Sequence, residues 1–308
     1  MVGDRVRKLG RHWADLTADA AEVVQQLRPL LGQLGEELGE LEDVYGSIIV
    51  NALPPYSAAR TDVLRLPGGW TERDEVAVEE PLEIRVNGEA VAVTMRTPGH
   101  DEELALGFLL SEGLSPVEAS FPADLAANTV EATAEHFDAE ALRRNFYTSS
   151  SCGVCGKGAL EAVAVEAPRV ESELHVPVEV VSALPDRLRA SQPTFAATGG
   201  LHATGLFTAA GDLLHAREDV GRHNAFDKVV GRAFLDGLLP LADKVVCVSG
   251  RLSFELVQKA AVAGCPVVVA VGAPSSLAIE LGRDRGVTLC GFVRDGRVNV
   301  YSEPWRIS

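Results

Sequence analysis

The first sixty residues carry a helical pattern of apolar positions. Between Asp15 and Glu42, leucines recur at spacings of three and four residues, with Gln and Glu on the opposite face. Pro29 and several glycines interrupt this pattern, and a Pro-Pro pair within residues 51–60 is typical of a linker. We expect residues 1–59 to form a helical appendage and linker, dispensable rather than a dedicated docking arm.

The pattern then changes from helical to alternating. Apolar and polar residues alternate over residues 75–97, and Asn87-Gly88 supplies a turn, which predicts a β-hairpin. Asp101 follows the hairpin and is placed to cap a helix over residues 102–110. A hairpin followed by a helix predicts an N-terminal α+β part, which we place at residues 60–195 together with the cysteine motif described below.

The last third of the chain alternates between short apolar runs and helical patterns. It opens with a second predicted hairpin over residues 201–216. The predicted helices are 222–236, 253–263 and 275–281, and the predicted strands are 245–248, 267–271 and 287–292. Short β-branched strands between helices indicate a buried parallel sheet covered by helices, so residues 196–308 form an α/β part.

Composition and charge narrow the class of protein. The chain has 308 residues, 46% hydrophobic and 23% charged, which excludes a wholly disordered chain. The apolar stretch at residues 265–281 is broken by prolines and glycine, and the start of the chain is charged, so we expect a cytoplasmic protein without a membrane span. The net charge of −16 argues against a nucleic-acid partner. Residues 200–308, with 12 Lys+Arg against 11 Asp+Glu, remain able to bind a small anion.

A pair of cysteines three residues apart is the sharpest local motif. Cys152 and Cys155 lie in a glycine-rich segment beside Lys157, a setting that keeps thiols accessible and lowers the pKa of a thiolate. Five cysteines in a chain of this length indicate reduced thiols. A zinc site, a thioredoxin-like dithiol, a sulfur carrier and a structural loop all share this spacing. The other cysteines offer no second ligand pair and the motif does not follow a first strand, so a persulfide carrier is favoured.

A second cluster of polar groups spans residues 198–228. Asp219 is placed to cap the next predicted helix, whose first turn exposes backbone N–H groups that attract anions. The candidate ligand residues here are His202, Arg222, His223, Asn224 and Lys228. We interpret the cluster as a phosphate pocket. A capped amphipathic helix with ordinary surface charges is the alternative, but it does not account for the combination of His, Asn and Lys.

Two strand-to-helix junctions carry small residues and hydroxyls. Ligands of open α/β sheets gather at the carboxyl ends of strands, where these junctions are predicted to lie. The candidates at the junctions are Ser249, Gly250, Arg251 and Ser275, with Arg294 and Arg297 nearby in the sequence. Together they predict a large phosphorylated ligand, although neither junction has the spacing of a known nucleotide motif.

These motifs, in this order, resemble the formate dehydrogenase accessory sulfurtransferase family, FdhD. The resemblance runs from about Arg60 to Ile307 and rests on Ser-Ser-Cys-Gly-Val-Cys-Gly, Gly-Gly-Leu-His-Ala, Asp-Val-Gly-Arg-His-Asn-Ala-Phe-Asp-Lys, Ser-Gly-Arg-Leu-Ser-Phe-Glu and Gly-Phe-Val-Arg-Asp-Gly-Arg. It implies an α/β fold with a cytidine-deaminase-like mixed sheet covered by helices, an N-terminal β-hairpin/α subdomain, and a homodimer.

The resemblance also implies a function. A member of this family would accept sulfane sulfur from a cysteine desulfurase as a cysteine persulfide. It would deliver that sulfur to the bis-molybdopterin guanine dinucleotide cofactor before formate dehydrogenase receives the cofactor. Guanine nucleotides such as GDP would mimic the ends of this ligand, and the protein would hold no tightly bound metal of its own.

Roles for individual residues follow from the same resemblance. Cys152 would carry the persulfide and Cys155 would assist its transfer. The guanine nucleotide ends would contact His202, Arg222, His223, Asn224, Lys228, Ser249, Gly250, Arg251, Ser275, Phe292, Val293, Arg294, Asp295, Gly296 and Arg297.

Two rival functions come from other classes. A zinc deaminase needs a Glu two residues after its His, and Thr204 stands at that position after His202, so a deaminase-like hydrolase is disfavoured. A non-catalytic chaperone for the molybdenum cofactor would bind the same ligand. It has no need of accessible thiols, so the cysteine pair distinguishes it from a carrier.

Overall fold

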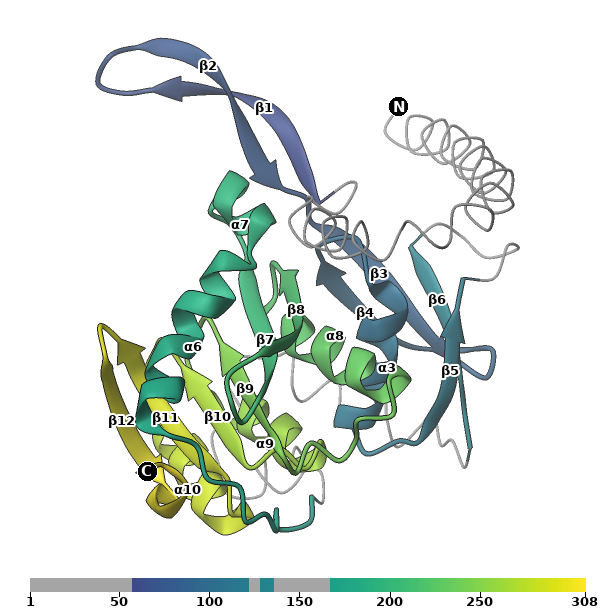
Figure 1. Cartoon of the computed structure of the whole chain (residues 1–308). Coiled ribbons are helices and arrows are strands. Elements are labelled where there is room, and N and C mark those ends of the chain that lie inside the picture. Colours follow the sequence, from purple (N-terminus) through teal and green to yellow (C-terminus); the bar gives the residue numbers. More distant parts are fainter. Residues whose placement is uncertain (1–56, 122–127, 136–166) are drawn as a thin grey trace, which may run out of the picture. The chain divides into compact units, whose positions relative to one another are not determined.

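The computed structural model describes residues 57–121, 128–135 and 167–308, which belong to one compact unit, Leu53–Ser308. Within these residues the strands form three sheets of two, six and four strands (Figure 1). The helices of the described ranges include none that is long and apolar enough to cross a bilayer. The predicted α/β class is therefore confirmed in outline.

A two-stranded ribbon opens the described chain. Strands β1 (Ala58–Arg65) and β2 (Trp70–Ala77) pair antiparallel along their whole length (Figure 1). The pattern of apolar residues did not predict this ribbon. Both of its faces are exposed and carry charged side chains, so its sequence has no single apolar face to produce a period of two.

The four-stranded sheet has the order β4-β3-β6-β5. Its strands are β3 (Glu80–Val86), β4 (Glu89–Arg96), β5 (Pro116–Ser120) and β6 (Thr129–Ala134). The predicted hairpin is confirmed as β3 and β4, with Asn87 and Gly88 at φ of 50° and 85° in the turn. Helix α3 (Asp101–Ser111) packs Leu104 and Leu109 on this sheet and forms one hydrophobic core with it.

The prediction that Asp101 caps α3 is wrong. His100, in the left-handed conformation, occupies the N-cap position, and Asp101 is already the first helical residue. The Asp101 carboxylate instead accepts two hydrogen bonds from Arg96, at 3.0 and 2.8 Å. The carboxylate that the sequence predicted as a helix cap therefore binds the buried Arg96 guanidinium instead of the backbone N–H groups of α3.

The six-stranded sheet has the order β12-β11-β10-β9-β7-β8 and is mixed. Its strands are β7 (His202–Thr208), β8 (Leu213–Asp219), β9 (Lys244–Val248), β10 (Val267–Ala270), β11 (Thr288–Arg294) and β12 (Arg297–Ser302). Strands β9, β10 and β11 are parallel, and the outer strands pair antiparallel. The predicted mixed sheet is confirmed, whereas its likeness to cytidine deaminase stays a prediction.

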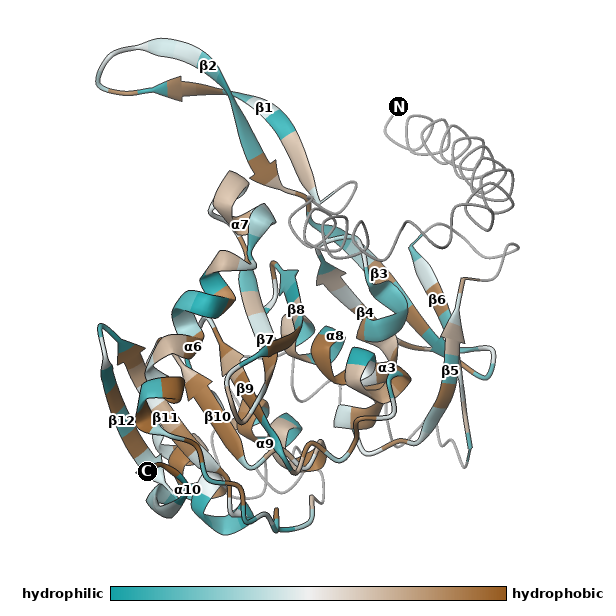
Figure 2. Ribbon diagram, in the orientation of Figure 1, coloured by the Kyte–Doolittle hydropathy of each residue, from teal (hydrophilic) through white to brown (hydrophobic). Residues whose placement is uncertain are grey.

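Helices cover both faces of this sheet. They are α6 (Val178–Ala190), α8 (Arg222–Leu235), α9 (Phe254–Val262) and α10 (Ser276–Arg285). The short helix α7 (Pro193–Thr198) contacts β1 and β2 instead, and a 3-10 turn at Pro304–Arg306 ends the chain. One core lies under α6 and a second under α8, α9 and α10. Figure 2 shows the central strands of the sheet as predominantly hydrophobic, as burial on both faces requires.

Close contact between α3 and α8 joins the two larger sheets. A Cβ atom at Gly107 would lie 1.8 Å from the Asp227 carbonyl oxygen, and one at Gly231 would lie 1.9 Å from that of Glu103. Two glycines, one on each helix, therefore let the backbones approach more closely than any side chain would permit.

Candidate functional site

A cavity of about 580 Å³ lies at the carboxyl ends of the parallel strands. Ser249 follows β9, Val271 follows β10, and Val293 stands near the end of β11. The opposite wall comes from α6, α7 and the turn after α7. Such strand ends are where open α/β sheets bind ligands, so the cavity lies where the sequence predicted a site.

Five of the predicted ligand residues line this cavity. They are His202, Ser249, Val293, Arg294 and Asp295. Ser249 is held on β7 from both sides, because its hydroxyl accepts from the Ala203 N–H at 2.8 Å and its own N–H donates to the Ala203 carbonyl at 2.9 Å. The cavity floor is therefore an extension of the sheet rather than a free loop.

The turn between β11 and β12 forms part of the rim. Asp295 and Gly296 have φ of 52° and 72°, and Phe292 has φ of 52°. The Phe292 N–H donates to the Gly272 carbonyl at 3.1 Å, which ties this turn to the end of β10. Phe292 is 41% exposed, and Arg297 begins β12 opposite Arg294. Of the predicted residues of this segment, Val293, Arg294 and Asp295 line the cavity, whereas Phe292, Gly296 and Arg297 are outside its lining.

Positive charges surround His202. Burial lowers the pKa of its imidazole, and the charges of Arg222, His223 and Arg251 lower it further. Gly250 comes so close that a Cβ atom there would lie 3.5 Å from Nδ1 of His202. The imidazole is consequently neutral at neutral pH, within a region that favours an anion.

His223 and Arg222 occupy the first turn of α8. Nε2 of His223 lies 3.3 Å from the Ser253 hydroxyl and 3.4 Å from Oε2 of Glu255, and the contact with His223 lowers the pKa of Glu255 to about 2. Nε of Arg222 is buried and has no hydrogen-bond partner among the described residues. This nitrogen is therefore an unsatisfied donor, although Arg222 is not in the cavity lining.

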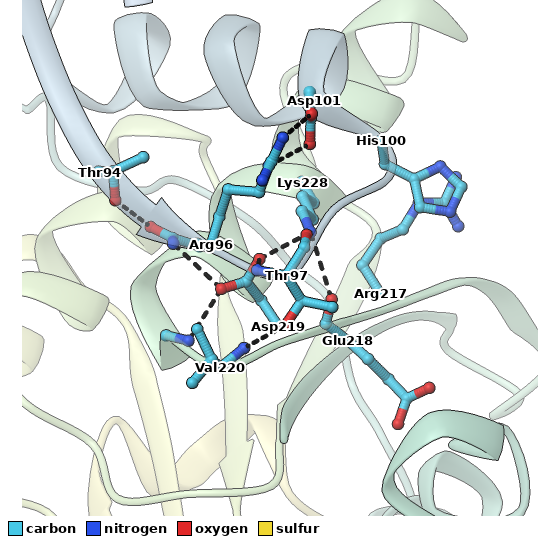
Figure 3. Close-up of polar contacts among 12 residues, drawn as sticks. Thr94, Arg96, Thr97, His100, Asp101, Arg217, Glu218, Asp219, Val220 and Lys228 are labelled. Carbon is cyan, nitrogen blue, oxygen red and sulfur yellow. Dashed lines mark hydrogen bonds and ion pairs between the residues drawn. The ribbon is translucent and has the colours of Figure 1, made fainter. Parts of the chain in front are cut away.

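Asp219 does not cap α8, which corrects the second predicted cap. Gly221 occupies the N-cap position, and Asp219 ends β8 with its side chain fully buried. Its carboxylate lies 2.7 Å from Nζ of Lys228 and accepts hydrogen bonds from the Thr97 and Gly221 N–H groups (Figure 3). Lys228 is itself 1% exposed, so its ammonium faces the interior rather than a ligand.

Asn224 belongs to the same buried network. Its amide nitrogen donates to Oδ1 of Asp219 at 3.0 Å and to the Met95 carbonyl at 2.8 Å, and its amide oxygen accepts from Thr94 at 3.2 Å. Asn224 and Lys228 therefore attach the start of α8 to β4. They position their neighbours Arg222 and His223 instead of reaching the cavity.

Ser275 and Arg251 are also among the predicted residues outside the cavity lining. Ser275 is the N-cap of α10, and its hydroxyl accepts from the Ala278 N–H at 3.2 Å. Arg251 is exposed and follows the end of β9, close enough to His202 for its charge to lower the pKa of that imidazole. The junctions thus contribute a helix cap and a surface cation.

The wall built from α6 and α7 was missed by the sequence analysis. Its cavity-lining residues are Ser182, Pro185, Asp186, Leu188, Arg189, Gln192 and Phe195. The Arg189 guanidinium lies 4.0 Å from the centre of the Phe195 ring. A signal was present, because Val181, Leu184 and Leu188 repeat at helical spacing and are buried under α6.

Cys152 and Cys155 lie outside the described residues. The other three cysteines are buried and unbridged, and burial raises the pKa of each thiol, to about 12 for Cys265 and Cys290. These three thiols therefore do not ionise near neutral pH. In the described ranges, no group of three or more His, Cys, Asp or Glu side chains is arranged to hold a metal ion.

Comparisons with known proteins agree with one another. The model of the FdhD/NarQ family matches residues 77–308. The sulfur carrier protein FdhD of Streptomyces avermitilis is 47% identical over 268 residues, covering 81% of this chain and 95% of that protein. That of Mycobacterium tuberculosis is 47% identical over 258 residues, covering 77% and 93%. The crystal structure of a putative formate dehydrogenase accessory protein from Desulfotalea psychrophila superimposes with a TM-score of 0.67 at 28% identity, covering 82% of this chain and all of that one.

Proposed function

This chain belongs to the FdhD/NarQ family, and from that premise we propose that it is a sulfur carrier that works as a sulfurtransferase. It accepts sulfane sulfur from a cysteine desulfurase as a persulfide on Cys152. It passes this sulfur to bis-molybdopterin guanine dinucleotide, which formate dehydrogenase then receives. The observation that carries the proposal is the cavity at the strand ends in a chain whose close relatives are named sulfur carriers.

The sulfur chemistry of the proposal is thiol exchange. The Cys152 thiolate attacks the terminal sulfur of the donor persulfide, an S–S bond forms on Cys152, and the donor cysteine leaves as a thiolate. Release as sulfide needs two electrons. Cys155 supplies them by attacking Sγ of Cys152, which expels hydrosulfide and leaves a disulfide between the two cysteines. Two neighbouring thiols thus suffice for one round of loading and release, and an external thiol must reduce the disulfide before the next round.

The charges around the cavity support a nucleotide ligand. His202, Ser249 and Arg294 line a volume of about 580 Å³, within the range of small-molecule sites. Nε of Arg222 is a buried donor without a partner among the described residues, and an anionic oxygen would satisfy it. A phosphorylated, guanine-containing end of the cofactor combines the negative charge and the planar ring that these surroundings favour.

The test of the carrier is a loading experiment. Incubation with a cysteine desulfurase and cysteine should add one sulfur atom to Cys152, detected by mass spectrometry and by cyanolysis. Cys152→Ala should abolish loading, Cys155→Ala should load but deliver poorly, and Cys290→Ala, which removes a buried thiol, should load normally. Wild-type protein that stays unmodified while it binds GDP would overturn the carrier and favour a cofactor-binding chaperone.

Assembly and metal content belong to the same proposal. We propose a cytoplasmic homodimer without a tightly bound metal, because two thiols alone do not complete a tetrahedral zinc site. Light scattering at the mass of one chain would contradict the dimer. Stoichiometric zinc that is lost on mutating Cys152 or Cys155 would contradict the metal-free carrier.

A further inference from the structure

Glu218 binds the first turn of a helix far from it in the sequence. Its Oε2 accepts from the Thr194 N–H at 3.0 Å and its Oε1 from the Phe195 N–H at 2.7 Å. These amides begin α7, where Gln192 at the N-cap makes no side-chain cap within the described structure. A carboxylate from β8 thus satisfies two N–H groups that a helix start leaves without partners.

Helix α7 depends on such outside contacts. It has six residues, too few to persist alone in water. A second anchor comes from the ribbon side, where the buried hydroxyls of Ser57 and Thr194 lie 3.3 Å apart. The position of α7 is therefore decided by the residues that hold its first turn.

The same short helix builds the cavity wall. Phe195 lines the cavity with its ring 4.0 Å from the Arg189 guanidinium, and Gly199, which ends α7 at φ of 67°, lines it as well. The charge of Arg189 also acts on Glu218, where it opposes the effect of burial on the pKa of that carboxyl. Glu218, Phe195 and Arg189 therefore form one connected group.

The next residue in β8, Asp219, contacts the start of α8 rather than α7. Figure 3 shows the Glu218 carboxylate directed away from that of Asp219, as alternation along a strand requires. Asp219 secures the start of α8, with Arg222 and His223 in its first turn. Two consecutive acidic residues thus fix two different elements beside the cavity.

We propose that Glu218 is a positioning residue: by holding α7, it sets the wall of Phe195 and Arg189 against which a planar ring of the ligand stacks. The anchoring of α7 stands on the geometry alone. The identity of the ligand rests on the proposed function. Glu218 itself does not touch the ligand, so its effect on binding passes through Phe195.

The anchoring is tested by hydrogen exchange on Glu218→Gln. The amide keeps the size of the side chain but replaces one acceptor by a donor that opposes a backbone N–H. We expect protection of amides 194–199 to fall about tenfold or more, as loss of a charged hydrogen bond implies, while α9 and α10 stay protected. Glu179→Gln, an exposed glutamate in the first turn of α6, is the matched control. Unchanged protection of residues 194–199 in Glu218→Gln would overturn the proposal.

The positioning is tested by a double-mutant cycle with GDP as the probe. Glu218→Gln and Phe195→Ala should each weaken GDP binding about tenfold, and the double variant should bind no worse than Phe195→Ala. A loss in the double variant equal to the product of the single losses would overturn the route through Phe195. If wild-type protein binds no GDP, the nucleotide part of the proposed function fails, and the exchange measurement still decides whether Glu218 holds α7.

Discussion

The Asp219 carboxylate and the Lys228 ammonium are 2.7 Å apart, with 0% and 1% of the two side chains exposed. Both groups also bind Thr97 of the chain segment that leaves β4, through its N–H and its carbonyl. The pair therefore joins the six-stranded sheet to the four-stranded sheet.

Removing one member of this pair should destabilise the fold strongly. Asp219→Asn leaves the Lys228 charge buried without a counter-ion, which costs about 3–5 kcal/mol of the free energy of unfolding. Urea denaturation measures the loss. The control is Asp243→Asn, which removes a 75% exposed carboxylate 2.6 Å from Lys244 and should cost less than about 1 kcal/mol. Similar midpoints for both variants would show that the buried pair is unimportant.

The contact between α3 and α8 predicts intolerance of any side chain at its glycines. Gly107→Ala and Gly231→Ala each place a methyl group within 2 Å of a carbonyl oxygen, so the helices must separate. Overpacking of this kind costs about 1–3 kcal/mol or more, seen as a lower melting temperature. Leu235→Ala, at the half-exposed end of α8, should change it little. Full stability of both glycine variants would mean that the helices do not pack this closely.

His100 should make stability fall in mild acid. Desolvation of the ring and the nearby charge of Arg217 lower the pKa of His100 from 6.5 to about 4, although 42% of the side chain is exposed and Glu103, 3.6 Å from Nδ1, acts in the opposite direction. Between pH 4 and 6.5 the imidazole is protonated in the unfolded chain but neutral in the folded protein. The contribution of His100 to the free energy of unfolding is therefore lost as pH falls from 6.5 towards 4. His100→Gln should flatten this part of the pH profile of the free energy of unfolding. Parallel profiles for wild type and His100→Gln would refute the shift.

Two arginines should matter for nucleotide binding. Arg222→Ala and Arg294→Ala should each weaken the binding of GDP by about 1.5–3 kcal/mol if their hydrogen bonds to phosphate are charged and shielded from solvent. Calorimetry gives the affinities, and Arg283→Ala, an exposed arginine on α10, serves as the control. Equal affinities for all three variants would place the nucleotide elsewhere.

Deletion of residues 1–56 and deletion of residues 1–59 should have different effects on stability, although the deleted segments differ by only three residues. Ser57 is buried, its carbonyl accepts from the Val78 N–H at 2.9 Å, and its hydroxyl lies beside that of Thr194. Deletion of residues 1–56 should therefore leave stability and GDP binding unchanged, whereas deletion of residues 1–59 also removes this anchor and the start of β1. We expect a lower melting temperature for the longer deletion. Identical behaviour would show that Ser57 adds nothing to α7.

Local patterns in the sequence were sufficient where a segment has one buried face. The hairpin of β3 and β4 and the strands β9, β10 and β11 were predicted because their apolar residues show the period or the run that burial demands. The sequence also predicted candidate ligand residues at strand ends, and three of these candidates, His202, Ser249 and Arg294, line one cavity. The roles of Cys152 and Cys155, which lie outside the described residues, stay predictions.

Tertiary structure decided what each polar group is bound to. Asp101 and Asp219 both look like helix caps in sequence, yet each carboxylate is taken by a buried cation, Arg96 for the first and Lys228 for the second. Thr97, which completes the Asp219 network, is 122 positions away from it along the chain. Such contacts leave no local period, because a hydrogen bond depends on distance in space and not on spacing in sequence. For the same reason the hydrogen bond from the Phe195 N–H in helix α7 to the Glu218 carboxylate on strand β8 could be found only once the chain had folded.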